Sequence, residues 1–341
     1  MILYPPGFEE RTGKGLMKKR DALVTLALLL AAAWPACHKS EATRLREVAA
    51  ETRKGDAKVS APLPLDPAQP VQLATLEDRR VDESSGLVAS RRSPGLLWTH
   101  NDSGDGPYVY AFDRAGRSRG AWRVEGARAV DWEDIAAGPG PARGQSYLYA
   151  GDIGDNDRER DFVVVYRFPE PEIPAGQAGG KEERRTEPAE AIRLKYPDGA
   201  HNAEALAVHP TTGDLYVITK ANAEAGVYKL SAPFDPKAVN TLAKVATLRG
   251  PDFFGTLVTG ADISPDGRRV AVCDYAQGYE LKLPEGSKDF DEVWKQKPAA
   301  YSLGARIQGE SVAYRLDGAA LLATSEKTPT PLFVVVLPGR Q

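Results

Sequence analysis

The stretch Asn202-Ala-Glu-Ala-Leu-Ala-Val-His-Pro-Thr-Thr-Gly-Asp-Leu-Tyr-Val-Ile-Thr219 shows the pattern that decides the fold. An acidic phrase opens a short apolar strand, a turn rich in Pro, Thr and Gly follows, and a second apolar strand completes a hairpin. Related phrases occur five times, at Glu83–Leu87, Asp131–Ile135, Asn202–Leu206, Thr259–Ile263 and Gln308–Val312. Intervals of about 50 to 70 residues indicate a stacked array of one supersecondary unit.

We therefore predict an all-β fold, a β-propeller of four-stranded blades. One blade for each phrase makes five blades, and Val71–Thr75 is expected to supply the missing fourth strand of the last blade and so close the ring. Six blades are the alternative, because the interval from Ile135 to Leu206 is long. That interval contains only four strand-like stretches, and we interpret the polar stretch Pro171–Glu187 as an exposed insertion.

The composition is that of an ordinary soluble globular domain. The chain has 341 residues, of which 42% are hydrophobic and 27% are charged, and its formal net charge is -3. Such a balance offers no basic surface to phosphate backbones, so we expect no nucleic-acid partner.

The N-terminal region is typical of an export signal. A basic segment, Met17–Arg20, precedes the short apolar run Ala22–Trp34, which is too short to span a bilayer. We predict a signal segment at 1–36 with translation starting at Met17, a lipidated cysteine at Cys37, a tether at 37–70 and the propeller at 71–341. An uncleaved or differently cleaved signal is the alternative to lipidation. The predicted location is the cell envelope, anchored through lipid on its periplasmic or outer surface.

Acidic side chains are expected to gather at one end of the propeller channel. In each blade the first strand starts, and the second strand ends, on the same face, because the two are antiparallel neighbours. Carboxylates crowded there repel one another unless a cation neutralises them, and oxygen ligands favour calcium. Candidate metal ligands are Glu83, Asp102, Asp131, Glu133, Asp134, Asp152, Asp155, Glu204, Asp262, Asp274 and Glu310.

The candidate catalytic residues are His100 and Lys220. His100 follows a predicted strand and is open to three interpretations: a ligand, a base or a hydrogen-bonded strand-end residue. Lys220 can offset the carboxylates or bind an anionic ligand. Cys273 lies in an apolar strand and is interpreted as a buried hydrophobic residue. The common hydrolase and nucleotide-binding motifs are absent from the sequence.

Four phrases carry a resemblance to a known group: Trp98–Gly104, Asp131–Ala136, Gly151–Asn156 and Val258–Gly267. They resemble a group of uncharacterised exported bacterial propeller proteins over residues 75–338. More loosely, the acidic face is similar to that of calcium-dependent propeller enzymes, namely regucalcin-type lactonases, strictosidine-synthase-like proteins and propeller phytases. That resemblance implies a metal site and no catalytic assignment, since those enzymes have six blades.

Three functions are compatible with these features. The first is a cell-envelope module whose calcium-binding face takes a small anionic ligand or an envelope protein. The second is a metal-dependent hydrolase of a phosphoester or lactone, in which a carboxylate or His100 moves a proton. In the third, the calcium ion only stabilises the blades.

Overall fold

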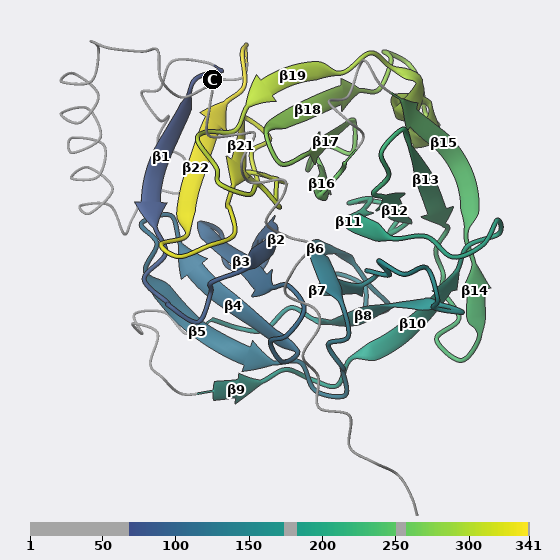
Figure 1. Ribbon diagram of the computed structural model, residues 1–341, viewed down its shortest axis with the longest axis horizontal. Coiled ribbons are helices and arrows are strands. Elements are labelled where there is room, and N and C mark those ends of the chain that lie inside the picture. Colours follow the sequence, from purple (N-terminus) through teal and green to yellow (C-terminus); the bar gives the residue numbers. More distant parts are fainter. Residues whose placement is uncertain (1–67, 174–182, 250–256, 340–341) are drawn as a thin grey trace, which may run out of the picture. The chain divides into compact units, whose positions relative to one another are not determined.

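The computed structural model describes residues 68–173, 183–249 and 257–339. They form five sheets around a common axis, which confirms the five-bladed β-propeller (Figure 1). The predicted signal segment, Cys37 and positions 37–67 of the predicted tether lie outside the described residues. Within the described residues, no helix has the length and hydropathy needed to cross a membrane.

Each blade is built on four antiparallel strands that follow one another across the sheet. Blade 1 contains β2 (Ser84–Ala89), β3 (Leu96–Asn101), β4 (Tyr108–Asp113) and β5 (Ser118–Arg123). Blade 2 contains β6 (Trp132–Pro139), β7 (Ser146–Asp152), β8 (Val163–Pro169) and β10 (Glu190–Lys195). Blade 3 contains β11 (Ala203–Val208), β12 (Leu215–Thr219), β13 (Glu224–Leu230) and β15 (Ala243–Arg249). Blade 4 contains β16 (Gly260–Ile263), β17 (Arg269–Cys273), β18 (Gln277–Lys282) and β19 (Ala299–Ser302), with a 3-10 helix, η2 (Phe290–Lys295), before β19.

Blade 5 combines the two ends of the propeller domain. It contains β20 (Ala313–Tyr314), β21 (Ala320–Ala323), β22 (Pro331–Val336) and β1 (Pro70–Thr75). The antiparallel pairing of β1 with β22 confirms the predicted closing strand. Because the ring is closed in this way, the last blade presents no unpaired third strand at its edge.

Two short parallel strands extend blades 1 and 2. The segment β9 (Glu183–Arg185) pairs with β5, and β14 (Val239–Thr241) pairs with β10. The segment Pro171–Glu187, which we expected to be an exposed insertion, therefore contributes an edge strand to the preceding blade. The reason is that backbone amides on the outer edge of β5 find partners there.

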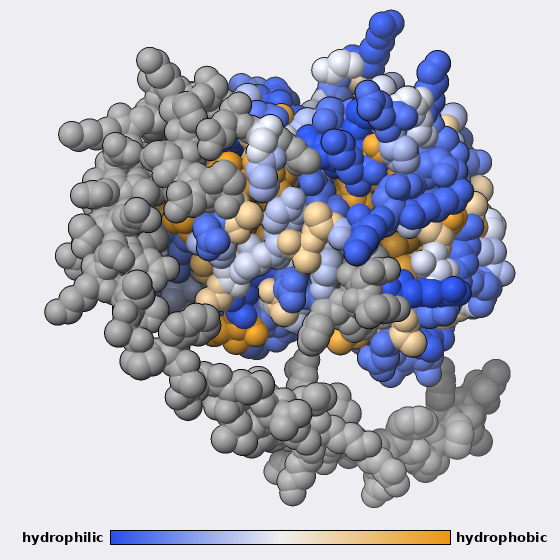
Figure 2. All heavy atoms as spheres, turned by 90° about the horizontal axis from the view of Figure 1, so that it is seen from above, coloured by the Kyte–Doolittle hydropathy of each residue, from blue (hydrophilic) through white to orange (hydrophobic). Residues whose placement is uncertain are grey.

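The hydrophobic core lies between blades. Within the described residues, one apolar cluster separates each pair of neighbouring blades, and the inner strands β2 and β11 are buried along their whole length. Figure 2 shows the opposite character on one side of the molecule, where hydrophilic residues dominate the visible surface. Inner strands therefore bury even their Ser, Glu and Asp residues, because both of their faces pack against neighbouring blades.

In every blade, a tight turn joins the first strand, which lies nearest the axis, to the second strand. The turns between the first two strands of the five blades contain glycines with positive φ, namely Gly95, Gly144, Gly213, Gly267 and Gly318. These turns lie at the channel end opposite to the strand starts. In register, Trp132 faces Asp152, Ala203 faces Thr219 and Gly260 faces Cys273. The start of each first strand thus lies beside the end of the second.

Two buried aspartates join blades near the axis. Oδ2 of Asp134 accepts hydrogen bonds from the amides of Leu206 (2.9 Å) and Ala261 (3.1 Å), which belong to blades 3 and 4. Its Oδ1 accepts one from Ile135 (2.8 Å). In the same way, Oδ2 of Asp262 accepts a hydrogen bond from the Tyr314 amide of blade 5 (2.7 Å). Side chains of the inner strands therefore replace the backbone pairing that separate sheets cannot make.

We expect Asp134→Ala to lower the free energy of unfolding by about 3 kcal/mol or more, because each buried amide left without an acceptor costs about 1–3 kcal/mol. Asp157→Ala is the control, since Asp157 is exposed and such surface changes usually stay within about 0.5 kcal/mol. Urea denaturation of the full chain measures both. Equal midpoints for the two variants would show that Asp134 does not hold the blades together.

Candidate functional site

Carboxylates from four blades meet at the channel end where the inner strands start, and we call this set the acidic mouth. Electrostatic interactions link its members across blades: Glu133 with Glu204, Glu204 with Glu310, and Glu326 with Asp102. The acidic mouth consists of Glu83, Asp102, Asp131, Glu133, Glu204, Glu310 and Glu326.

Three members lie close enough to hold one metal ion. One carboxylate oxygen from each of Asp102, Asp131 and Glu133 lies within 4.8 Å of the others. Asp102 follows β3, whereas Asp131 precedes β6 and Glu133 belongs to it, so the triad spans blades 1 and 2. Glu133 is buried and the two aspartates are half-buried, which leaves one side of the group accessible.

Gly154 makes room for this triad. Its amide donates a hydrogen bond to the Asp131 carbonyl (3.1 Å). A β-carbon at Gly154 would collide with the carboxylates of both Asp131 and Glu133. The glycine in the phrase Asp152-Ile-Gly-Asp155 is therefore needed for close approach of the chain to the carboxylates.

A lysine from blade 3 neutralises part of the acidic mouth. Lys220 Nζ donates to both oxygens of Glu204 at 2.5 Å and to the hydroxyl of Tyr275 at 2.5 Å. Burial lowers the pKa of Lys220, but the ion pair with Glu204 outweighs that effect and raises the pKa above its usual value. Lys220 is therefore a fixed cation and is paired with Glu204.

Burial and mutual repulsion disfavour the ionised forms of the other carboxylates in the acidic mouth. Burial, followed by repulsion from Glu204, raises the pKa of both Glu133 and Glu310 well above the usual range. Burial and then Asp102 raise the pKa of Glu326 to about 7. A cation at the acidic mouth would favour the ionised forms and relieve this repulsion.

Five of the candidate ligands have other partners. Asp134 and Asp262 accept the interblade amides described above. Asp152 forms an ion pair with Arg160 (2.8 Å) and accepts a hydrogen bond from the Asp131 amide (3.2 Å). The remaining two, Asp155 and Asp274, accept backbone amides of their own loops. Their roles as metal ligands stay predictions.

His100 is fully buried between blades 1 and 2. Its ring meets Trp132 edge to face, with centroids 5.7 Å apart, and Nδ1 lies 2.7 Å from the Asn101 carbonyl. Burial lowers the pKa of His100, so the ring is neutral and Nδ1 carries the proton toward that carbonyl. In this arrangement solvent does not reach the imidazole.

Sequence reasoning did not single out Tyr275 or Gly154 and did not count Glu326 among the metal ligands. Tyr275 follows β17, a place comparable to that of Lys220 after β12. Aligning the ends of the second strands in different blades would have placed Tyr275 at the acidic mouth beside Lys220. Cys273 is buried, and burial raises the pKa of its thiol to about 12, so the thiol stays protonated.

The sequence matches no protein-family model and no curated protein.

We expect the chelator-treated full chain to melt at a higher temperature at about pH 5 than at about pH 8. Glu326 and Asp262 each have a pKa raised to about 7 in the folded chain, from 4.5 and 3.8. Folding therefore favours their protonated forms, and the stability that they contribute below the unfolded pKa is lost as the pH rises through about 7. Carboxyls with a lowered pKa, such as Asp198 at about 2, stay ionised throughout this window.

Calorimetry at both pH values measures the difference. Glu326→Gln should make the difference smaller, because an amide does not titrate. A higher melting temperature at about pH 8 than at about pH 5 would contradict the raised pKa values of Glu326 and Asp262.

Proposed function

We propose that the protein is an exported, lipid-anchored propeller of the cell envelope that binds calcium at the acidic mouth. The observation that carries the calcium site is that one carboxylate oxygen from each of Asp102, Asp131 and Glu133 lies within 4.8 Å of the others. Carboxylate oxygens are the ligands that calcium prefers, and calcium takes six to eight of them. Three protein carboxylates therefore leave coordination positions for water and for a ligand.

The ligand that fits this arrangement is a small anion or an acidic group of an envelope protein. A bound calcium ion supplies positive charge at an accessible position, and Lys220 supplies a second cation nearby that is already paired with Glu204. An anionic group can complete the coordination of the ion, whereas without the ion the acidic mouth repels it. Calcium therefore acts as the bridge between the propeller and its ligand.

We expect calcium at about 100 times its Kd to stabilise the full chain by about 2.7 kcal/mol, which raises Tm by roughly 5 °C. Asp131→Asn should abolish most of this shift, because it removes a triad charge. Asp157→Asn is the matched control in the loop after β7 and should keep the shift. Differential scanning calorimetry with calcium and then with chelator, together with elemental analysis, measures the effect.

If calcium raises the Tm of Asp131→Asn as much as that of the unmodified protein, the ion binds somewhere other than the triad. If calcium does not raise the Tm of the unmodified protein, the proposed calcium site is wrong. If calcium raises Tm but no anionic ligand binds to the loaded protein, the ion has only a stabilising role.

A second candidate function is calcium-dependent hydrolysis of a phosphoester or lactone. The observation in its favour is Glu326, a carboxyl with a pKa of about 7 next to Asp102. Such a group can give or take a proton near neutral pH. The calcium ion would polarise the substrate oxygen.

For this candidate, we expect Glu326→Gln to lower kcat by about 100-fold, the usual contribution of general acid–base catalysis, without lowering Tm. A panel of phosphomonoesters, phosphodiesters and lactones, each with calcium or chelator, measures turnover. Glu187→Gln, an exposed change away from the acidic mouth, serves as the control. Absence of calcium-dependent turnover across the panel would leave the binding function alone.

A further inference from the structure

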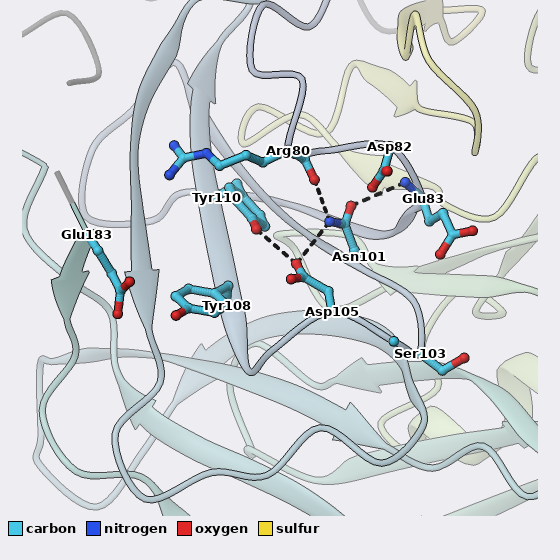
Figure 3. A pocket seen from close by; sticks show the side chains of 10 residues that line it. Arg80, Asp82, Glu83, Asn101, Ser103, Asp105, Tyr108, Tyr110 and Glu183 are labelled. Atoms are coloured by element: carbon cyan, nitrogen blue, oxygen red, sulfur yellow. Dashed lines mark hydrogen bonds between the residues drawn. The ribbon is translucent and has the colours of Figure 1, made fainter. Parts of the chain in front are cut away.

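A cavity of about 560 Å³ lies on blade 1 next to the acidic mouth (Figure 3). This volume is in the range of small-molecule sites. The loop that follows β3 separates the two sites: Asp102 belongs to the metal triad, whereas Ser103, Gly104 and Asp105 line the cavity. The full lining comprises Arg80, Asp82, Glu83, Asn101, Ser103, Gly104, Asp105, Tyr108, Tyr110 and Glu183.

Two tyrosines form an aromatic corner in this cavity. Tyr108 and Tyr110 are two residues apart on β4, so their side chains leave the same face of the strand. Their ring centroids are 6.5 Å apart with an angle of 36° between the planes. The Arg80 guanidinium already lies 5.5 Å from the Tyr110 ring centroid, which shows that this corner accommodates a cation.

The polar groups at the centre of the cavity lining are hydrogen-bonded to one another. Asn101 Nδ2 donates to the Arg80 carbonyl (2.6 Å) and to Asp105 (2.9 Å), and its Oδ1 accepts the Glu83 amide (3.2 Å). The Tyr110 hydroxyl also donates to Asp105 (2.8 Å). A ligand therefore meets few uncommitted hydrogen-bond donors here, which disfavours polyhydroxylated and anionic molecules.

Carboxylates remain on both sides of the aromatic corner. Figure 3 shows Glu183, from β9, on one side of the tyrosines, and Asp82 and Glu83 on the other. Glu183 and Asp82 are exposed and Glu83 is half-buried, so a ligand can reach them.

The neighbouring arginines Arg80 and Arg185 form their ion pairs with carboxylates outside the cavity. Arg80 forms an ion pair with Asp78 (2.6 Å). Arg185, the last residue of β9, forms one with Glu125 (2.6 Å). Neither Asp78 nor Glu125 lines the cavity. The cavity therefore has acceptors and negative charge at both ends and aromatic rings between them.

We propose that this cavity binds an organic cation with ammonium groups at both ends of an aliphatic stretch. One ammonium group pairs with Glu183, the other pairs with Asp82 and Glu83, and the chain between them packs on Tyr108 and Tyr110. Two sources have this chemistry: a free polyamine, and neighbouring lysine side chains of a peptide. The site is separate from the calcium triad and does not depend on the proposed calcium function.

Isothermal titration of the full chain with spermidine, in chelator and at low salt, tests this assignment. We expect one site, weakened about tenfold by Glu183→Gln and by Asp82→Asn, since each removes a charged hydrogen-bond partner. Glu187→Gln removes an equal charge near β9 but outside the cavity, and should leave the affinity unchanged. Asp131→Asn should also leave it unchanged, because Asp131 does not line the cavity.

The aromatic corner has its own matched pair of variants. Tyr108→Phe keeps a ring and should retain the affinity, whereas Tyr108→Leu removes the ring and should lower the affinity about fivefold. Titration with butylamine, which has one ammonium group, should give much weaker binding than spermidine. A dipeptide of two lysines with blocked ends is the second probe; the tighter of the two ligands identifies the source.

No heat with either dication at millimolar concentration would overturn the proposal. So would equal losses in Glu183→Gln and Glu187→Gln, which would indicate general attraction to an acidic surface. Loss of spermidine binding in Asp131→Asn alone would place the polyamine at the acidic mouth.

Discussion

The interblade hydrogen bonds of Asp134 are the interaction on which the arrangement of the channel depends. Separate sheets meet at the axis of the propeller without backbone pairing between their inner strands, and apolar packing between blades is not directional. The carboxylate of Asp134 accepts amides from blades 3 and 4, and Asp262 repeats this contact between blades 4 and 5. The starts of the inner strands are thereby held at one level, where Glu133, Glu204 and Glu310 meet.

That alignment creates the electrostatic problem of the acidic mouth. Lys220 forms an ion pair with only one of these carboxylates, Glu204, and only partly offsets the charge of Glu133 and Glu310. Glu133 and Glu310 remain buried, and their pKa values are raised by burial and by repulsion from Glu204. A protein that keeps several buried carboxylates so close together is either protonated there or bound to a cation, and the triad at Glu133 is the place where the oxygens converge best.

Most of the fold could be predicted from the sequence because a propeller repeats a local unit. The five phrases, the hairpin glycines and the closing strand at Val71–Thr75 are patterns within a few residues. By contrast, β9 and β14 have three residues each, and their partners lie in another blade. Such long-range parallel pairing leaves no periodic signal.

The site was predictable only in part, for a related reason. Strand starts and ends locate Asp102, Asp131 and Glu133 on one face. Whether an aspartate faces the opening or an amide of the next blade depends on where that blade lies, so the role of Asp134 could not be read from its phrase. The cavity on blade 1 depends likewise on Glu183, which lines it together with Tyr108 but comes from an insertion of blade 2.

The pairing of β9 with β5 also couples the local opening of two blades. The chain that caps the outer edge of blade 1 belongs to the connection between β8 and β10 of blade 2. When that connection detaches, amides at the edge of β5 lose their cover, and hydrogen exchange at Arg123 would report an event in blade 2. Blade 2 and blade 3 are linked in the same way through β14. Protection from exchange at an outer edge is therefore a property of the neighbouring blade as much as of the strand itself.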